Sequence, residues 1–350
     1  MPPEPNPVTR HVPSAGFGLR AVLLAALLLV LGLIAWRLSD VVLLMFGAVI
    51  VAVALKAFAA LLQRVLPMPP RLAVLAAVLL TLAVTLSGSW LIGDRLVEQT
   101  EVLRQRLPEA LAALEAWAHG QPIGRAVLTL WGNTQAEDLP WARVANAATR
   151  TLGAIGNVGL MLLLGVYLAL DPALYRRGLV RLVPPGWRAR IDDALLASTQ
   201  ALSQWLMGQG ISMLFVGTST AVGFALLDMP LAITMGVIAG VLAFVPFFGP
   251  IASGILAVLL AFMEGPTQAL YVAGLCIVIQ QIEGNVLMPF VQRWAVDLPA
   301  VLGIVSAVVF GLLFGLAGVI LATPLMVVVR VLVDKLYVEA VLEAPPPALP

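Results

Sequence analysis

Long apolar segments fill most of this 350-residue chain and limit what it can fold into. Apolar residues make up 61% of the sequence and charged residues only 11%, whereas soluble domains carry about 25% charged residues. So few charges cannot cover the surface of a water-soluble fold of this size. The sequence therefore predicts an all-α integral membrane protein, with the lipid bilayer as its surroundings.

Composition also excludes several classes of function. The formal net charge is +1, so no basic field exists to attract nucleic acid. The single cysteine, Cys276, lies in an apolar run and cannot form an intrachain disulfide. His11 and His119 fall outside the apolar segments, and the HExxH and GxGD patterns are missing, so no intramembrane enzyme is predicted. We expect no cofactor and no resident metal ion.

The apolar segments suggest about eight membrane segments, because a helix crosses a bilayer with about 20 residues. Six of them fit that length, at 19–36, 41–62, 72–93, 151–170, 207–228 and 267–287. Two others, 231–263 and 300–333, are too long, because 33 residues would form about 50 Å of helix against a hydrocarbon core of about 30 Å. We expect these two to be broken or hairpin-like.

The first apolar segment could also be read as a signal peptide, because Arg10, His11 and Arg20 precede it. No small-x-small cleavage site follows, and the next apolar segment begins almost at once at Val41. The sequence therefore favours a first membrane anchor.

Charge placement predicts the topology. The predicted loop 171–206 carries five arginines and is placed in the cytoplasm of a bacterial inner membrane, which leaves both termini cytoplasmic. The other parts follow in order: a disordered tail (1–18), three spans (19–93), a helical extramembrane region (94–150), two spans (151–228), a C-terminal transport core (229–336) and a disordered tail (337–350). Leucines at helical spacing in 94–150 suit a solvated hairpin on the outer face, or else a subunit contact or movable lid.

The first candidate site is the break in AGVLAFVPFFGPIASG, residues 239–254. Pro246 and Pro250 lack an N–H, so the carbonyls of Leu242 and Pro246 lose their helical partners. Gly249 precedes a proline and is biased away from helical geometry. Transporters use such non-helical backbone to build ion and substrate sites. The alternative is a plain turn between two short helices at the interface.

The second candidate site is the middle of 300–333, where Gly311, Gly315 and Gly318 cluster ahead of Pro324. The G-x-x-x-G pair of Gly311 and Gly315 also suits close helix packing, which is the alternative interpretation. If both long segments return to their starting sides, they enter from opposite faces and point toward each other. Two opposed hairpins would suit an inverted-repeat transporter core.

The third candidate site lies in IVIQQIEGNVLMPFVQRWAVDLP, residues 277–299. At 100° per residue, Gln281 and Asn285 share one helix face, while Gln280 and Glu283 share another. An ionisable residue inside a span is a functional candidate, although Glu283 would also suit an ordinary boundary carboxylate. Asp297, which precedes Leu298 and Pro299, also suits an N-cap.

Four stretches in this order resemble the signature of the autoinducer-2 exporter family, the PerM-like permeases: FVPFFGP (244–250), QQIEGNVLMPFVQ (280–292), the step from Asp297 to Pro299, and GLLFGLAGVILATP (311–324). The resemblance extends more weakly to the layout of the whole chain. It implies export of the signal autoinducer-2 or sodium/proton antiport. It singles out eight positions: Pro246, Gly249, Pro250, Glu283, Asn285, Pro289, Asp297 and Pro299. This chain has Phe247 and Phe248 where the family often has a tyrosine.

Three functions stay open. The leading one is a secondary transporter that exports a small polar solute such as autoinducer-2, with an amide lining from Gln280, Gln281 and Asn285. The alternative is a sodium (or lithium)/proton antiporter, in which Glu283 or Asp297 exchanges its proton for a monovalent cation. The third is a membrane scaffold or regulator that transports nothing. The extramembrane helices and glycine-bearing spans lead us to expect a homo-oligomer.

Overall fold

The computed structural model describes residues 38–84, 86–87, 102, 105, 108–109, 112, 151–292 and 299–342. The chain divides into two compact units, residues 1–43 and 44–350, and only 38–43 of the first are described. Within the described residues every regular element is a helix, as expected. The predicted anchor 19–36, the tail 1–18 and nearly all of 94–150 lie outside them.

The first helices of the larger unit pack through small residues. Helix α2 (Ser39–Val65), a helix at Pro70–Val84 and α6 (Thr151–Leu170) share an alanine-rich core. Close helix approach of this kind is typical of membrane proteins, because small side chains let the backbones come together. Helices α2 and α6 agree with the predicted spans 41–62 and 151–170.

Two helices occupy the basic segment 171–206. Helix α7 (Pro172–Arg181) is bent by 87° from α6, and α8 (Arg188–Leu226) follows a short 3₁₀ turn, η2 (Pro185–Trp187). The predicted span 207–228 is therefore the second half of a 39-residue helix. Its first half carries the polar sequence that the hydropathy pattern placed in a loop.

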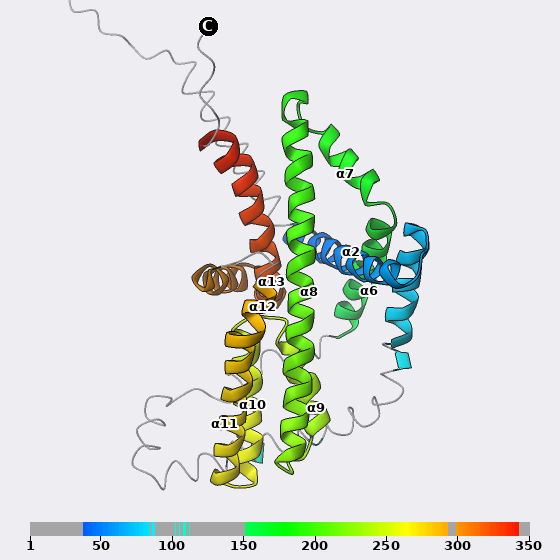
Figure 1. The fold of residues 1–350 in the computed structure, drawn as a ribbon. Coiled ribbons are helices and arrows are strands. Elements are labelled where there is room, and N and C mark those ends of the chain that lie inside the picture. The colour runs from blue at the N-terminus through cyan, green and yellow to red at the C-terminus, as the bar shows by residue number, and fades with distance from the viewer. Residues whose placement is uncertain are drawn as a thin grey trace, which may run out of the picture. The chain divides into compact units, whose positions relative to one another are not determined.

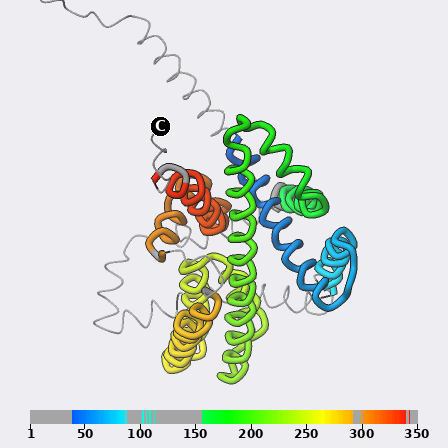
Figure 2. Tube along the Cα trace, turned by 45° about the horizontal axis from the view of Figure 1, so that its top comes forward, coloured from blue at the N-terminus to red at the C-terminus, as the bar shows by residue number. Residues whose placement is uncertain are grey.

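The long segment 231–263 is broken, as predicted, and forms a helical hairpin. Helix α9 (Ala232–Leu242) packs along α8, and α10 (Phe248–Met263) packs along α11 (Pro266–Ile282), as Figures 1 and 2 also show. Met235 near the start of α9 shares one apolar cluster with residues from the end of α10 and the start of α11. Helix α10 therefore returns toward the side from which α9 came.

The base of this hairpin is held by apolar and polar contacts. Phe224 at the end of α8 is fully buried in the same cluster, and Val102 packs against it from the predicted extramembrane region. The Gln268 amide of α11 donates a hydrogen bond to the Leu227 carbonyl at the end of α8, at 2.6 Å. The ends of α8 and α10 and the start of α11 thus lie together.

The tip of the hairpin is tight. The Phe248 N–H donates to the Pro246 carbonyl at 2.8 Å across Phe247, whose φ of 66° and ψ of −51° form a γ-turn of the strained kind. A Cβ added at Gly249 would lie 1.8 Å from the Leu242 carbonyl oxygen. The return of α10 beside α9 therefore depends on a glycine at this position.

Directly after α11 the chain continues as helix through a π-helical turn. A π-helical turn, η3 (Glu283–Leu287), leads into the short α12 (Met288–Gln292). The predicted span 267–287 lies within an apolar helical run from Pro266 to Val291.

The second long segment is also interrupted where its glycines cluster. Helix α13 (Ala300–Val333) has a non-helical residue at Gly315, with φ of 64° and ψ of −145°. A Cβ added at Gly318 would lie 2.0 Å from the Phe310 carbonyl oxygen, so the arms touch at the bend. The arms then diverge in Figure 1, so α13 is bent but does not form a second hairpin like that of α9 and α10.

The C-terminal end of α13 continues as helix beyond the predicted boundary. A π-helical segment, η4 (Asp334–Leu342), occupies residues where the sequence predicts the start of a disordered tail at 337. The Lys335 ammonium donates to Glu339 at 2.9 Å and lies 3.6 Å from Asp193 on α8. One ion pair thus lies within the segment and the other joins it to α8.

The predicted count of eight membrane segments is not confirmed. Among the described residues, four helical runs are long and apolar enough to cross a membrane, or five if α6 and α7 form one bent span. The four runs are Ser39–Val65, Pro185–Leu226, Pro266–Val291 and Val301–Glu339. Helices α9 and α10 have 11 and 16 residues, which is short for a crossing that needs about 20.

Replacement of Gly249 by alanine tests the tight tip. We expect Gly249→Ala to lower the free energy of unfolding by about 1–3 kcal/mol, because the added methyl group meets a backbone carbonyl that cannot rotate away. Gly254→Ala is the matched control in the same helix, since nothing lies within 4 Å of its Cβ position. It should be neutral or stabilise by up to about 1 kcal/mol. Thermal unfolding in detergent compares the two, and equal effects would contradict the close approach.

Candidate solute pathway between α8 and the hairpin

Polar side chains on one face of α8 are buried against the hairpin and α11. Gln209, Ser212 and Thr220 are at most 6% exposed and recur at helical spacing with Val216, which is also buried. Sequence reasoning missed all three. Gln209, Ser212, Val216 and Thr220 are three, four and four residues apart, so they share one helix face. This spacing could have identified them from the sequence, because a polar side chain is costly in an apolar helix unless it has a partner.

Gln209 reaches the break at the tip of the hairpin. Its amide Nε2 donates to the Ala243 carbonyl at 2.5 Å, at the C-terminal end of α9. The two carbonyls predicted to lose their helical partners are satisfied locally, because Leu242 accepts from the Val245 N–H and Pro246 accepts from the Phe248 N–H. The break therefore recruits a side chain from α8 for a different carbonyl, that of Ala243.

Ser212 makes the next contact, with Glu283. The Ser212 hydroxyl donates to Glu283 Oε1, and the Gln280 side chain hydrogen-bonds to the same carboxylate. Glu283 is 7% exposed and begins the π-helical turn η3. Its carboxylate is therefore buried between α8 and the turn η3. Such π-turns are frequent at functional sites.

The two predicted faces of this region separate as expected. The Asn285 amide donates to Gln281 Oε1 at 2.6 Å, and both side chains are exposed. Gln280 and Glu283 face the interior on the other side. The three amides predicted to line one site are therefore divided, and only Gln280 belongs to the buried group.

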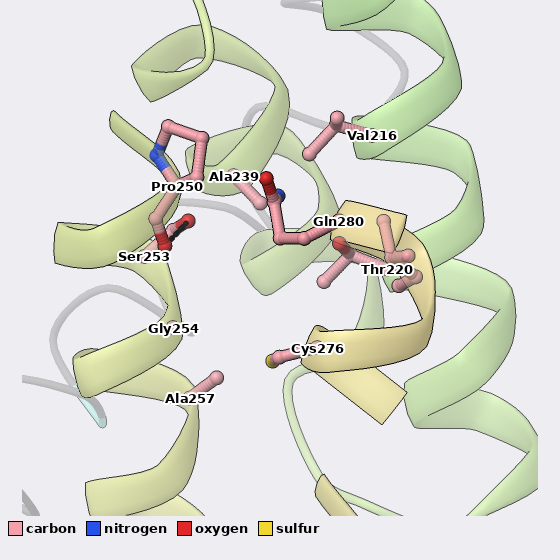
Figure 3. A pocket seen from close by; sticks show the side chains of 10 residues that line it. Val216, Thr220, Ala239, Pro250, Ser253, Gly254, Ala257, Cys276 and Gln280 are labelled. Carbon is pink, nitrogen blue, oxygen red and sulfur yellow. Dashed lines mark hydrogen bonds between the residues drawn. The ribbon is translucent and has the colours of Figure 1, made fainter. Parts of the chain in front are cut away.

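A pocket lies between α8, the hairpin and α11 (Figure 3). The space between its walls is about 310 Å³, a figure that includes the part open to the outside. Its polar lining comes from Thr220 on α8, Ser253 on α10 and Gln280 on α11, which points between the helices in Figure 3. Pro250 and Cys276 line it as well. Because Gln280 contacts both the pocket and Glu283, the pocket and the buried carboxylate belong to one polar cluster.

The remaining predicted positions lie in three other places. Pro246 and Gly249 form the tip of the hairpin, next to the pocket residue Pro250. Pro289 and Pro299 are exposed. Gly311 and Gly315 lie at the bend of α13, outside the pocket lining.

The cation site suggested for Glu283 and Asp297 cannot be built from both residues, because Asp297 lies outside the described part of the chain. Among the described residues, no three or more of His, Cys, Asp and Glu group as metal ligands. The polar cluster instead offers hydroxyls, one amide and one carboxylate, a set that suits hydrogen bonding to a small polar molecule.

Comparisons with known proteins identify a family of transporters. Residues 23–337 match the sequence profile of the AI-2E family transporter. YueF of Bacillus subtilis, a protein named for transport, is 26% identical over 201 residues, which are 55% of this chain and 53% of YueF. A Synechocystis protein named for transport is 24% identical over 269 residues, 73% of this chain and 77% of its own. The AI-2 transport protein TqsA of Escherichia coli is 24% identical over 198 residues, 55% of this chain and 56% of TqsA. The match to YueF thus spans about half of its length.

A double-mutant cycle tests the contact between Ser212 and Glu283. We expect Ser212→Ala to lower the free energy of unfolding by about 1–3 kcal/mol, because it removes a hydrogen bond from a buried carboxylate. Combined with Glu283→Gln, the cycle should give a coupling energy of about 0.5–3 kcal/mol.

The control for this cycle is Ser219→Ala, a half-buried serine of the same helix. It should change stability by no more than about 0.5 kcal/mol and show no coupling to Glu283→Gln. Thermal unfolding in one detergent gives all values. Additive effects of Ser212→Ala and Glu283→Gln would refute the contact.

Proposed function

The chain belongs to the AI-2E transporter family, and from this premise we propose that it is a multi-pass secondary transporter that exports a small polar solute. The relatives described above are named for transport. The sequence contains no GxxxxGK[ST] motif, so an ion gradient or the gradient of the solute itself would drive transport.

The observation that supports this function best is the polar cluster buried inside apolar helices. Polar groups at membrane depth are costly, and they are tolerated where they bind one another or line a path for a polar molecule. Three of them, Thr220 of α8, Ser253 of α10 and Gln280 of α11, line one pocket. Five of these polar side chains would line the solute pathway, with Glu283 at its side. The five are Gln209, Ser212, Thr220, Ser253 and Gln280.

The chemistry of the pocket favours an uncharged, hydroxyl-rich solute. Its polar lining consists of two hydroxyls and one amide, which can each donate and accept hydrogen bonds. The volume open to water inside it is only about 20 Å³, room for about one water molecule, so a solute would enter only after the pathway widens. One relative is named for the transport of AI-2. We therefore propose autoinducer-2 as the first solute to test.

The hairpin is the part that we expect to open the pathway. Its tip holds a strained γ-turn at Phe247 and is joined to α8 by the hydrogen bond from Gln209 to Ala243. Strained turns of this kind concentrate at functional sites. A small displacement of the tip would break this bond and widen the pocket between α8 and α10.

A sodium (or lithium)/proton antiporter is the second candidate. The observation in its favour is Glu283, a buried carboxylate within an apolar helical run. In this case the carboxyl group would exchange its proton for the cation. None of the relatives described above carries this activity in its name. Proteoliposomes with a sodium gradient and a pH-sensitive dye distinguish it from solute export.

The proposed setting is the bacterial inner membrane, with both termini in the cytoplasm. The arginines of α7 and of the start of α8 support this orientation, because positive charge favours the cytoplasmic side. The base of the hairpin would then face outward, where Val102 of the predicted extramembrane region packs. A homo-oligomer remains part of the proposal.

The single cysteine of the chain allows a direct test. Cys276 lines the pocket, so modification by a bulky methanethiosulfonate reagent should fill the pathway and lower autoinducer-2 transport in proteoliposomes at least several-fold. Saturating autoinducer-2 should slow the labelling. Cys276→Ala should transport normally and resist the reagent.

The neighbouring residue provides the matched control. Ile277 is 61% exposed and points away from the pocket lining. Ile277→Cys in the Cys276→Ala background should be labelled without loss of transport. Full transport after complete modification of Cys276 would contradict the proposed pathway. Absence of transport of every solute and cation tested would leave the scaffold or regulator as the function.

A further inference from the structure

Helix α7 follows an apolar helix at a right angle. Asp171 caps it, because its Oδ1 accepts from the Leu174 N–H at 3.2 Å, and Pro172 occupies the first helical turn. The bend from α6 to α7 is 87°. If α6 crosses the bilayer, α7 therefore lies nearly parallel to the membrane surface.

One side of α7 is held by α8. Ala173, Arg176 and Val180 are half-buried at helical spacing, and the Arg176 guanidinium donates to Asp192 of α8 at 3.1 Å. No residue of α7 is fully buried. Helix α7 therefore depends on something else to cover its other side.

The other side is apolar and exposed. Leu174 and Leu179 are 58% and 54% exposed, and Leu182, directly after the helix, is 83% exposed. These leucines and Tyr175 lie within about 140° of arc at 100° per residue. Such a stripe on a soluble surface would be costly, whereas at the boundary of a bilayer it is favourable.

The charges around this stripe are almost all positive. Residues 172–191 contain five arginines and no acidic residue. The nearest acidic groups, Asp171, Asp192 and Asp193, each lie within 4 Å of a basic side chain, those of Arg71, Arg176 and Lys335. The exposed Arg177 and Arg181, four residues apart, lie beside the leucines. Long basic side chains in this position extend toward lipid phosphates.

An exposed aromatic residue follows α7 in the chain. Trp187 in η2 is 47% exposed, and the Arg190 guanidinium lies 5.8 Å from its ring centroid. Tryptophan is enriched at the membrane–water interface, because its ring is apolar and its N–H is polar.

We propose that α7 is an interfacial helix that binds anionic lipids. Leu174, Leu179 and Leu182 enter the boundary between headgroups and acyl chains, while Arg177 and Arg181 bind lipid phosphate. Through the ion pair of Arg176 with Asp192, the bound lipid fixes the depth of α8, which carries Gln209 and Ser212 further along. The inference depends on α6 crossing the membrane and is independent of the solute that is transported.

A fluorescence experiment on the full chain tests the insertion. NBD is attached at Leu179→Cys in a Cys276→Ser background, in nanodiscs of phosphatidylcholine with or without about one third phosphatidylglycerol. We expect blue-shifted emission that brominated lipids quench. Leu182→Cys gives a second label site if Leu179→Cys unfolds the protein.

Titration of short-chain phosphatidylglycerol in detergent tests the charge. One basic residue near a membrane surface contributes about 1 kcal/mol to anionic lipid binding, which corresponds to about a five-fold change in affinity. Arg181→Gln should weaken binding by about this factor, and Arg181→Lys should restore it. Arg64→Gln, an exposed arginine at the end of α2, is the control that loses the same charge and should bind normally.

Three results would overturn the proposal. An NBD group in water in both kinds of nanodisc would show that α7 does not insert. Quenching with equal affinity for both lipids would remove the anionic selectivity. Self-quenching that rises with protein copies per nanodisc, without an effect of brominated lipid, would mean that a second copy of the chain covers the leucines.

Discussion

The hydrogen bond from the Gln209 amide to the Ala243 carbonyl fixes where the hairpin ends against α8. Two prolines interrupt the apolar segment there, and backbone groups freed in an apolar medium cost several kcal/mol unless they find partners. Turns within the tip satisfy two of the carbonyls, and α8 supplies the partner for the third. The interrupted backbone of the hairpin tip is therefore bound to the polar face of α8, and the pocket lies along the same face.

The same requirement explains why the polar residues lie together. Gln209 is needed at the tip, and Ser212, one helical turn later, reaches Glu283 from the same face of α8. Thr220 follows two turns beyond and lines the pocket with Ser253 and Gln280. Gln209, Ser212 and Ser253 have hydrogen-bond partners that offset their desolvation, and the pocket lies where this row of contacts ends. A solute with hydroxyl groups could replace such contacts one by one.

Sequence reasoning predicted the parts that depend on local chemistry. Excess length and prolines located the break between α9 and α10, and clustered glycines located the bend at Gly315. Helical periodicity separated the face of Gln280 and Glu283 from that of Gln281 and Asn285. These features follow from bond geometry and helix angle, so a single sequence contains them.

The parts that depend on tertiary partners could not be predicted. The need for glycine at position 249 arises only when α10 returns beside Leu242, and the sequence does not say which helix packs where. The sequence analysis did not single out Gln209 and Ser212, because the role of a polar residue in an apolar helix depends on its partner on another helix. The count of about eight membrane segments is not confirmed among the described residues, because hydropathy alone does not distinguish a short helix of a hairpin from a crossing helix.

The distance between the two ends of the hairpin tests the account most directly. Spin labels at Ala225→Cys and Thr267→Cys, in a Cys276→Ser background in nanodiscs, flank the segment 231–263 on either side. If α10 returns beside α9, double electron–electron resonance should give a distance of about 20 Å or less, since the Gln268 side chain contacts the Leu227 carbonyl. A distance above about 30 Å, the thickness of the hydrocarbon core, would mean that this segment crosses the membrane and would contradict the hairpin.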